Sequence, residues 1–227
     1  MSFTERLHTL GDSISFTSIR NIAVDEISHL SRTEQDHLYE ELARGINVLD
    51  DDAHLNMYLR CFGLMHRAKA EEAFKNLPKP QNLFSEEIEI YDWGCGQGTA
   101  TICLLDFLRA CNITTHIKRI NLIEPSELAV KRTTDILSCY KETNNAAIRT
   151  ITKKFDDLEL SDIESYNCRK LHLFSNILDV ASFDLAKFTR LFHVRTMDAP
   201  VLTERTTTKG KRTPSRPPFL IPLHRGA

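Results

Sequence analysis

The sequence lacks several features that would assign a protein to a compartment or to a class of partner. Its 227 residues include no basic start followed by a long apolar run, so no secretory signal is indicated. No stretch approaches the roughly 18 apolar residues that would span a bilayer. The net charge is only -2, which by itself indicates neither a nucleic-acid partner nor a membrane partner. These absences favour a cytoplasmic protein without membrane attachment.

Cysteine is present, but it is not spaced for metal binding or for a redox motif. The six cysteines, at positions 61, 95, 103, 111, 139 and 168, include no Cys-x-x-Cys pair. Their spacing also lacks the regularity of a zinc site, so we expect no metal. Reduced thiols in the cytoplasm are the simplest interpretation.

Hydrophobic residues make up 41 % of the chain and charged residues 26 %, which allows a sizeable core. The length suits one domain with an extension or a helical cap. From Pro200 onward, six basic residues stand against one acid, and five of the eight prolines fall in the same segment. We therefore expect residues 200–227 to form a disordered or extended basic tail. Nucleic-acid binding by this tail is the alternative.

Residues 1–80 are predicted to form a helical cap. Ser31–Glu34 has the spacing of a capping box and opens one helix. A second helix is expected from residue 51 or 52 until Pro78, with an apolar face made of Leu55, Tyr58, Leu59, Phe62 and Met65. Ahead of both, residues 13–24 show some alternation, which indicates a short strand or hairpin.

From residue 88 the pattern changes to short apolar segments that alternate with helical ones. Strands are expected at 88–92, 119–124, 147–152 and 171–177, and helices at 99–111, 126–140 and 183–192. This alternation favours a parallel sheet covered by helices, in a domain of residues 81–199. Beyond it, Val201-Leu202 or Phe219–Ile221 would add at most a fragment of strand.

The most informative segment is Asp92-Trp93-Gly94-Cys95-Gly96-Gln97-Gly98, between the first predicted strand and its helix. Glycines let a ligand approach bare backbone, and a helix N-terminus favours an anionic group. The third glycine of the dinucleotide fingerprint would fall at position 99, which is Thr99, so the spacing opposes a nucleotide-binding oxidoreductase. Asp92 suits a ligand with cationic groups as well. S-adenosylmethionine (SAM) carries an ammonium, a sulfonium and a carboxylate.

This segment resembles the first motif of the class I, Rossmann-like SAM-dependent methyltransferases. The resemblance implies a SAM site formed by Asp92, Trp93, Gly94, Cys95, Gly96 and Gly98. It also implies a ribose-binding acid after the second strand, where Glu124 precedes Pro125, because a carboxylate can accept from both hydroxyls of a diol. Asp156 or Asp157 would lie near the adenine amino group, and Asn176 falls in the fourth motif. Open α/β sheets bind ligands at the carboxyl ends of their strands, where all these residues fall.

Two features of the sequence allow a functional and an ordinary interpretation. Cys95 lies inside the glycine segment, but no base is placed beside it, so a small side chain that fills space is favoured over a nucleophile. The predicted helix with Gly63, His66 and Lys69 either covers the SAM site or presents an ordinary amphipathic face. Glycine inside a helix costs about 1 kcal/mol relative to alanine, which points to close packing or ligand approach at Gly63.

The resemblance implies a SAM-dependent methyltransferase whose acceptor is open: RNA, a protein or a small molecule. Methyl transfer requires alignment of donor and acceptor more than a catalytic side chain, so no catalytic residue is assigned. The family's sheet normally continues with further strands, whereas only 35 residues follow Phe192. We therefore expect an α/β, Rossmann-like methyltransferase sheet that is incomplete at its C-terminal end, with an N-terminal helical cap. The alternatives are a catalytically inactive or truncated SAM-binding scaffold and a protein partner that completes the sheet.

Overall fold

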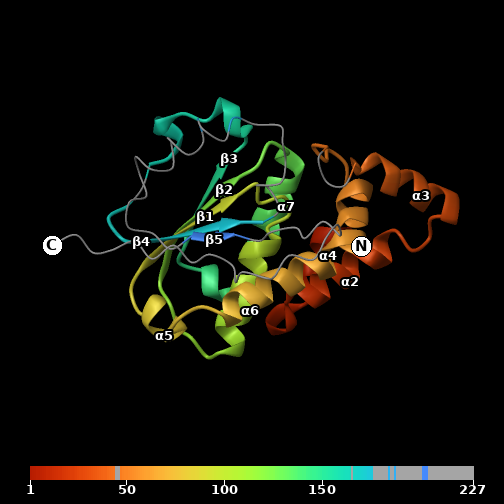
Figure 1. Ribbon diagram of the computed structural model, residues 1–227. Helices are drawn as coiled ribbons and strands as arrows, with labels where there is room; N and C mark the ends of the chain where they lie inside the picture. The colour runs from red at the N-terminus through yellow and green to blue at the C-terminus, as the bar shows by residue number, and fades with distance from the viewer. Residues whose placement is uncertain (44–46, 165, 176–183, 185–186, 188–200, 204–227) are drawn as a thin grey trace, which may run out of the picture.

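A computed structural model describes residues 1–43, 47–164, 166–175, 184, 187 and 201–203 of the chain. The described helices, labelled in part in Figure 1, are α1 (Phe3–His8), α2 (Phe16–Glu26), α3 (Arg32–Glu41), α4 (Asp52–Lys75), α5 (Pro80–Leu83), α6 (Thr99–Ala110) and α7 (Glu127–Ser138). Short 3-10 turns are η1 (Gly11–Ser13), η3 (Lys141–Thr143), η4 (Phe155–Asp157) and η5 (Leu160–Asp162). Within these residues, no helix combines the length and the apolar character needed to cross a membrane.

The described strands form one parallel sheet. They are β1 (Ile88–Trp93), β2 (Ile117–Ile123), β3 (Ala147–Ile151), β4 (Arg169–Phe174) and β5 (Val201–Thr203). Their order is β3-β2-β1-β4-β5, and every neighbouring pair is parallel. The chain therefore moves to one side of β1 and then to the other, which is the doubly wound arrangement with its switch point between β1 and β4. This order confirms the predicted Rossmann-like α/β fold.

Strands β1 to β4 agree with the four strands expected between residues 88 and 177. Each begins and ends within three residues of its expected position, and β5 is the short fragment predicted at Val201-Leu202. The expected helix at 183–192 lies outside the described residues, which hold only 184 and 187 of that range. The predicted tail, 200–227, also lies outside them apart from β5, so its disorder stays a prediction.

The prediction of a strand or hairpin at residues 13–24 is wrong, because this segment forms α2. Ser15 caps the helix: its Oγ accepts from the Ser18 backbone N–H at 3.2 Å, and the Ser15 N–H donates to Ser18 Oγ at 2.9 Å. A buried face then recurs at helical spacing, formed by Phe16, Ile19, Ile22 and Ala23. The cap formed by Ser15 and Ser18 and this buried face favour a helix more strongly than the alternation of residues 13–24 favours a strand.

The two other predicted helices of the cap are confirmed as α3 and α4. Ser31 and Glu34 form the expected capping box at the start of α3, and Asp51 caps α4 by accepting from the His54 N–H at 2.9 Å. The predicted apolar face of α4 is partly wrong, because Met65 is 43 % exposed. Its place on the buried face is taken by Gly63 and His66.

The N-terminal helices share one hydrophobic core with the sheet. This core joins side chains of α2 and α4, such as Phe16, Leu59 and Phe74, to sheet residues such as Ile90 and to α6. Figure 1 shows α2, α4 and α6 close together beside the sheet, with α3 farther from it. The cap therefore buries most of its apolar side chains against the Rossmann-like part, and a second, smaller cluster of Ile27, Leu42 and Met57 lies within the cap.

Gly63 is explained by close packing. A Cβ at this position would lie 3.1 Å from the Cζ atom of Phe16 and 3.6 Å from Cδ of Arg20, both on α2. Of the two explanations offered for a glycine inside this helix, the structure therefore supports contact between α2 and α4.

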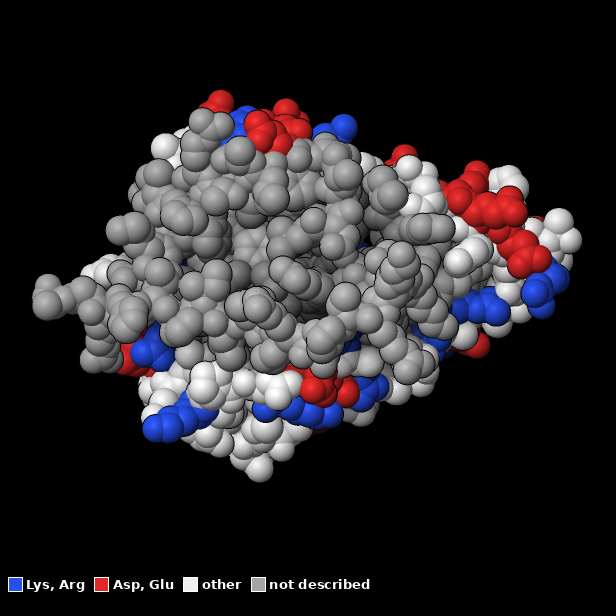
Figure 2. All heavy atoms as spheres, viewed as in Figure 1, with Lys and Arg blue, Asp and Glu red and all other residues white. Residues whose placement is uncertain are grey.

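A histidine joins the end of α3 to the start of α4. His54 Nδ1 bonds to the Asp51 carboxylate, and its Nε2 lies 3.0 Å from Oε2 of Glu41. Burial lowers the pKa of His54, but the hydrogen bonds to these two carboxylates outweigh it and raise the pKa above its ordinary value. Acidic side chains gather over α3, the helix that ends at Glu41 (Figure 2).

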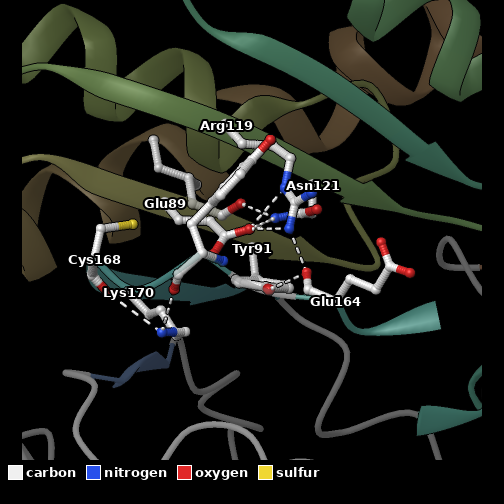
Figure 3. Close-up of polar contacts among 9 residues, drawn as sticks. Glu89, Tyr91, Arg119, Asn121, Glu164, Cys168 and Lys170 are labelled. Carbon is white, nitrogen blue, oxygen red and sulfur yellow. Dashed lines mark hydrogen bonds and ion pairs between the residues drawn. The ribbon is translucent and has the colours of Figure 1, made fainter. Parts of the chain in front are cut away.

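The face of the sheet opposite to the helices carries a buried polar cluster (Figure 3). Oε1 of Glu89 accepts from Nε of Arg119 at 2.7 Å and from Nδ2 of Asn121 at 3.0 Å. Tyr91 and Arg119 both donate to the backbone carbonyl of Glu164. In the described residues of this β3–β4 connection no α-helix forms, so side chains of the sheet hold the connection in place.

Candidate functional site

The loop after β1 runs through three glycines with left-handed backbone. The φ angles are 61° at Gly94, 50° at Gly96 and 73° at Gly98. Left-handed backbone costs other residues about 1–2 kcal/mol each, so the conformation itself favours glycine at alternate positions. The backbone N–H of Cys95 donates to the carbonyl of Ile123 at 3.1 Å, which ties the loop to the end of β2.

Gly96 and Gly98 face different surroundings. A Cβ at Gly98 would lie 2.5 Å from Cγ2 of Thr133 on α7, whereas a Cβ at Gly96 would meet no atom of the described residues within 4 Å. Gly98 is therefore required for packing as well as for its backbone. Gly96 presents bare backbone to open space, as an approaching ligand requires.

Asp92 is fully buried at the carboxyl end of β1. Its Oδ2 accepts from the Thr101 hydroxyl at 2.7 Å, whereas Oδ1 accepts no hydrogen bond within the described part of the chain. Burial raises the pKa of Asp92 to about 6, the bonds from Thr101 oppose the rise, and the charge of Glu124 adds to it. A buried carboxylate with one unpaired oxygen is costly, and a donor or a cation at Oδ1 would relieve that cost.

Glu124 meets the loop from the end of β2. Its Oε2 accepts from the Gly96 N–H at 3.0 Å, and its Oε1 accepts from the Ser126 N–H at 3.1 Å. Burial raises the pKa of Glu124, and these two backbone bonds partly offset the rise. Each carboxylate oxygen has a second lone pair, so Glu124 can accept further bonds while it holds the loop. Asp92, Gly96 and Glu124 thus lie together at the switch point.

Two other residues of the segment have buried side chains. The Cys95 thiol is buried, with Sγ 3.6 Å from the Gly96 carbonyl oxygen, and burial raises its pKa. A protonated thiol that fills space agrees with the interpretation favoured above. Trp93 packs on the opposite face of the sheet, parallel to Phe174 at 5.8 Å between ring centroids, and its Nε1 donates to Nδ1 of His172 at 3.0 Å.

The remaining predicted site residues are Asp156, Pro125 and Asn176. Asp156 lies in η4, after β3, and is exposed; its Oδ1 accepts from the Asp184 N–H at 2.8 Å. None of the hydrogen bonds of the described residues joins Asp156 to Asp92 or Glu124. Pro125 is half-buried next to Glu124. Asn176 lies outside the described residues.

The contacts that join the loop to α4 have no counterpart in the sequence pattern. Gln97, inside the glycine segment, donates from Nε2 to the Leu55 carbonyl at 2.8 Å. Ser126, at the start of α7, donates to the Leu49 carbonyl. The start of α4 and the residues before it therefore adjoin the loop. His66, farther along α4, stacks on Tyr58 instead, and burial lowers its pKa to about 4.

Comparisons with known proteins give structural similarity only. No family model and no curated protein matches the chain. It is similar to a SAM-dependent methyltransferase from Clostridium acetobutylicum, with 14 % identity and a TM-score of 0.42 over 64 % of this chain and 54 % of that one. The corresponding values are 14 %, 0.41, 72 % and 58 % for a SAM-dependent methyltransferase from Leishmania major. They are 20 %, 0.39, 63 % and 53 % for a structure of the Haloferax volcanii Trm112 methyltransferase activator in complex with a proposed methyltransferase.

The chain thus spans little more than half the length of these structures. Identities and TM-scores this low identify neither an activity nor an acceptor. Any function assigned to this chain therefore depends on the order of its strands and on the glycine loop at the switch point of the sheet.

Proposed function

We propose that this chain is a SAM-dependent methyltransferase that binds SAM at the glycine loop, between Asp92 and Glu124. The observation that carries the proposal is the buried Asp92 carboxylate, whose Oδ1 accepts no hydrogen bond from the described residues. A ligand with a cationic group would relieve this cost, and SAM carries two such groups. The loop stands at the carboxyl end of β1, where doubly wound sheets bind ligands.

Different residues of the site would bind different parts of SAM. The bare backbone at Gly96 and the N-terminus of α6 suit the carboxylate of SAM, because the helix dipole favours an anion there. Glu124 would accept from the ribose hydroxyls with its remaining lone pairs. Asp156 and Asn176 stay candidates for the adenine side. Bound SAM would supply an activated methyl group for in-line transfer, and the protein would align it with the acceptor and exclude water.

Calorimetry with SAM tests the binding site. We expect the full chain to bind SAM and the variant Gly96→Arg not to bind it, because the arginine would fill the open space above the loop. Gly11→Arg is a matched control: Gly11 also has a φ of 50°, and no atom of the described residues lies within 4 Å of a Cβ added there, but it lies in η1. The proposal is wrong if the unmodified chain gives no SAM binding, or if both arginine variants bind SAM equally.

Transfer of a radiolabelled methyl group from SAM to cell extract tests the activity. Separation of the labelled products into RNA, protein and small molecules would identify the class of acceptor. A chain that binds SAM and transfers nothing would be the inactive scaffold. If transfer requires an added fraction of the extract, a partner protein that completes the site or the sheet is needed.

A cytoplasmic location is part of the proposal. The six cysteines form no disulfide with one another. Free thiols of this kind are usual in a reducing compartment. Fractionation of cells that express the chain would test the location.

A further inference from the structure

A buried arginine on α7 connects the glycine loop to α4. Arg132 is 4 % exposed, and its Nη1 donates to Oδ1 of Asn56 at 2.6 Å and to Oε1 of Gln97 at 3.1 Å. Its Nη2 pairs with the carboxylate of Asp52, in the first turn of α4. One guanidinium therefore serves three acceptors, of which one belongs to the loop and two belong to α4.

The chemistry of the guanidinium orients both amides. A guanidinium can only donate, so Asn56 and Gln97 must present their oxygens to Arg132. The amide nitrogen of Gln97 consequently faces the other way, where it donates to the Leu55 carbonyl at 2.8 Å. Asn56 and Gln97 are both buried, so neither amide can exchange these partners for water. The loop residue is held by α7 on one side and by α4 on the other.

Neighbouring contacts extend this connection to the atoms of the candidate site. Thr133, next to Arg132 on α7, donates from Oγ1 to the Gly96 carbonyl at 3.0 Å. Glu124 accepts from the N–H of the same glycine. The hydroxyl of Ser126 reaches the Leu49 carbonyl, just before α4. The bare backbone at Gly96 is thus positioned by Thr133 and Glu124. Arg132, the neighbour of Thr133 in the sequence, holds the first turn of α4, and Ser126, which donates to Glu124, contacts the residue Leu49 before that helix.

We infer that Arg132 is a positioning residue that couples the first turn of α4 to the glycine loop, so that docking of the N-terminal helices and binding of SAM favour each other. The inference rests on the proposed function for its ligand, and on the contacts of Arg132 for the coupling itself. Coupling of this kind is reciprocal. SAM binding should therefore protect residues 49–56 from exchange, although SAM is proposed to bind at the loop.

Arg109 provides a matched control. It also joins the N-terminal segment to the Rossmann-like part, with a bond from Nη1 to the Ile14 carbonyl at 2.8 Å. Its Nε and Nη2 pair with both carboxylate oxygens of Glu142, at 2.8 and 2.9 Å. Arg109 is on α6, near its C-terminal end, whereas the glycine loop precedes the N-terminal end of that helix. Replacing it removes a partly buried arginine without touching the loop.

The experiment compares Arg132→Met with Arg109→Met in the full chain. Amide hydrogen exchange without SAM, SAM affinity by calorimetry and urea unfolding are measured for each. We expect Arg132→Met to speed exchange in residues 49–56 and 94–98 and to weaken SAM binding roughly tenfold, a usual size for coupling between sites. Arg109→Met should lower the urea midpoint and leave loop exchange and SAM affinity unchanged. Arg132→Lys should be intermediate, because one ammonium replaces a fork that serves three acceptors.

Each outcome decides the inference. Unchanged exchange in both segments of Arg132→Met, or equal effects of the two methionine variants, would overturn it. If Arg132→Met does not fold, Gln97→Met removes the loop's own contacts with α4 and α7, and the same two exchange readouts apply. Absence of SAM binding in the unmodified chain would refute the proposed function, and the exchange data without SAM would still decide whether Arg132 couples the two segments.

Discussion

Replacing Gly98 by alanine tests how the glycine loop is held against α7. The alanine Cβ would lie 2.5 Å from Cγ2 of Thr133, closer than side-chain atoms ordinarily approach. Thr133 is not free to turn aside, because its Oγ1 donates to the carbonyl oxygens of Gly96 and Ala129 at 3.0 and 2.9 Å. Two penalties therefore act on Gly98→Ala, one from the left-handed backbone and one from steric overlap.

The structure separates these penalties. A left-handed backbone costs alanine about 1–2 kcal/mol, and overpacking costs about 1–3 kcal/mol, so Gly98→Ala should lower the free energy of unfolding by about 2–5 kcal/mol. Gly96→Ala has a comparable backbone, and among the described residues no atom lies within 4 Å of its Cβ, so only the first penalty applies. Adding Thr133→Ser to Gly98→Ala removes Cγ2 and keeps the hydroxyl. The double variant should therefore regain the stability lost to steric overlap, minus about 0.8 kcal/mol for the loss of one buried methyl group.

Urea unfolding without SAM measures all three variants, with Thr133→Ser alone completing the double-mutant cycle. The expected order of stability is the unmodified chain, then Gly96→Ala, then Gly98→Ala, with the serine variant restoring part of the last loss. Equal losses for the two alanine variants, or no recovery with serine, would refute the view that contact with Thr133 requires glycine at position 98.

Three further predictions concern buried or paired charges. Burial raises the folded pKa of Asp92 from 3.8 to about 6, so the charge of Asp92 lowers the free energy of unfolding as the pH rises through this range. Asp92→Asn should therefore regain up to about 3 kcal/mol in urea unfolding near pH 8, and it should lose SAM binding in calorimetry. Burial lowers the pKa of His54, but hydrogen bonds to two carboxylates outweigh burial and raise this pKa. Protonated His54 therefore stabilises the fold fully at a pH below its ordinary pKa of 6.5, and this stabilisation is lost as the pH rises through the raised pKa. His54→Gln should consequently flatten the change of the urea midpoint with pH. Arg119→Met would leave the Glu89 carboxylate buried without its cation and should lower the free energy of unfolding by about 3–5 kcal/mol, measured in urea.

Each of these predictions has an outcome that contradicts it. Asp92→Asn that binds SAM like the unmodified chain would remove Asp92 from the site. An unchanged pH slope in His54→Gln would show that the α3–α4 contact does not depend on its charge. The double variant Glu89→Gln with Arg119→Met should be more stable than Arg119→Met alone, because the unpaired charge is gone; a further loss would contradict the argument.

The elements whose causes lie within a few residues were predictable from the amino-acid sequence alone. Ser31 and Glu34 predicted the start of α3, and alternating apolar runs predicted the strands, because capping and strand patterning depend on close neighbours. The glycines at 94, 96 and 98 were found for the same reason. Their left-handed backbone is a local property, and glycine is the residue that adopts it without strain.

Which distant groups share a site depends on how the folded chain brings them together. Gln97 contacts residues more than thirty positions away on both sides of the sequence, in α4 and α7, and no spacing rule connects them. The same holds for Oδ1 of Asp92, which accepts no hydrogen bond from the described residues, because a missing partner is visible only when the neighbouring residues are in place. Helix α2 was missed since its buried face is defined by the helices and sheet that cover it. Local backbone preferences are encoded in short segments, whereas burial and pairing depend on which segments the fold brings together.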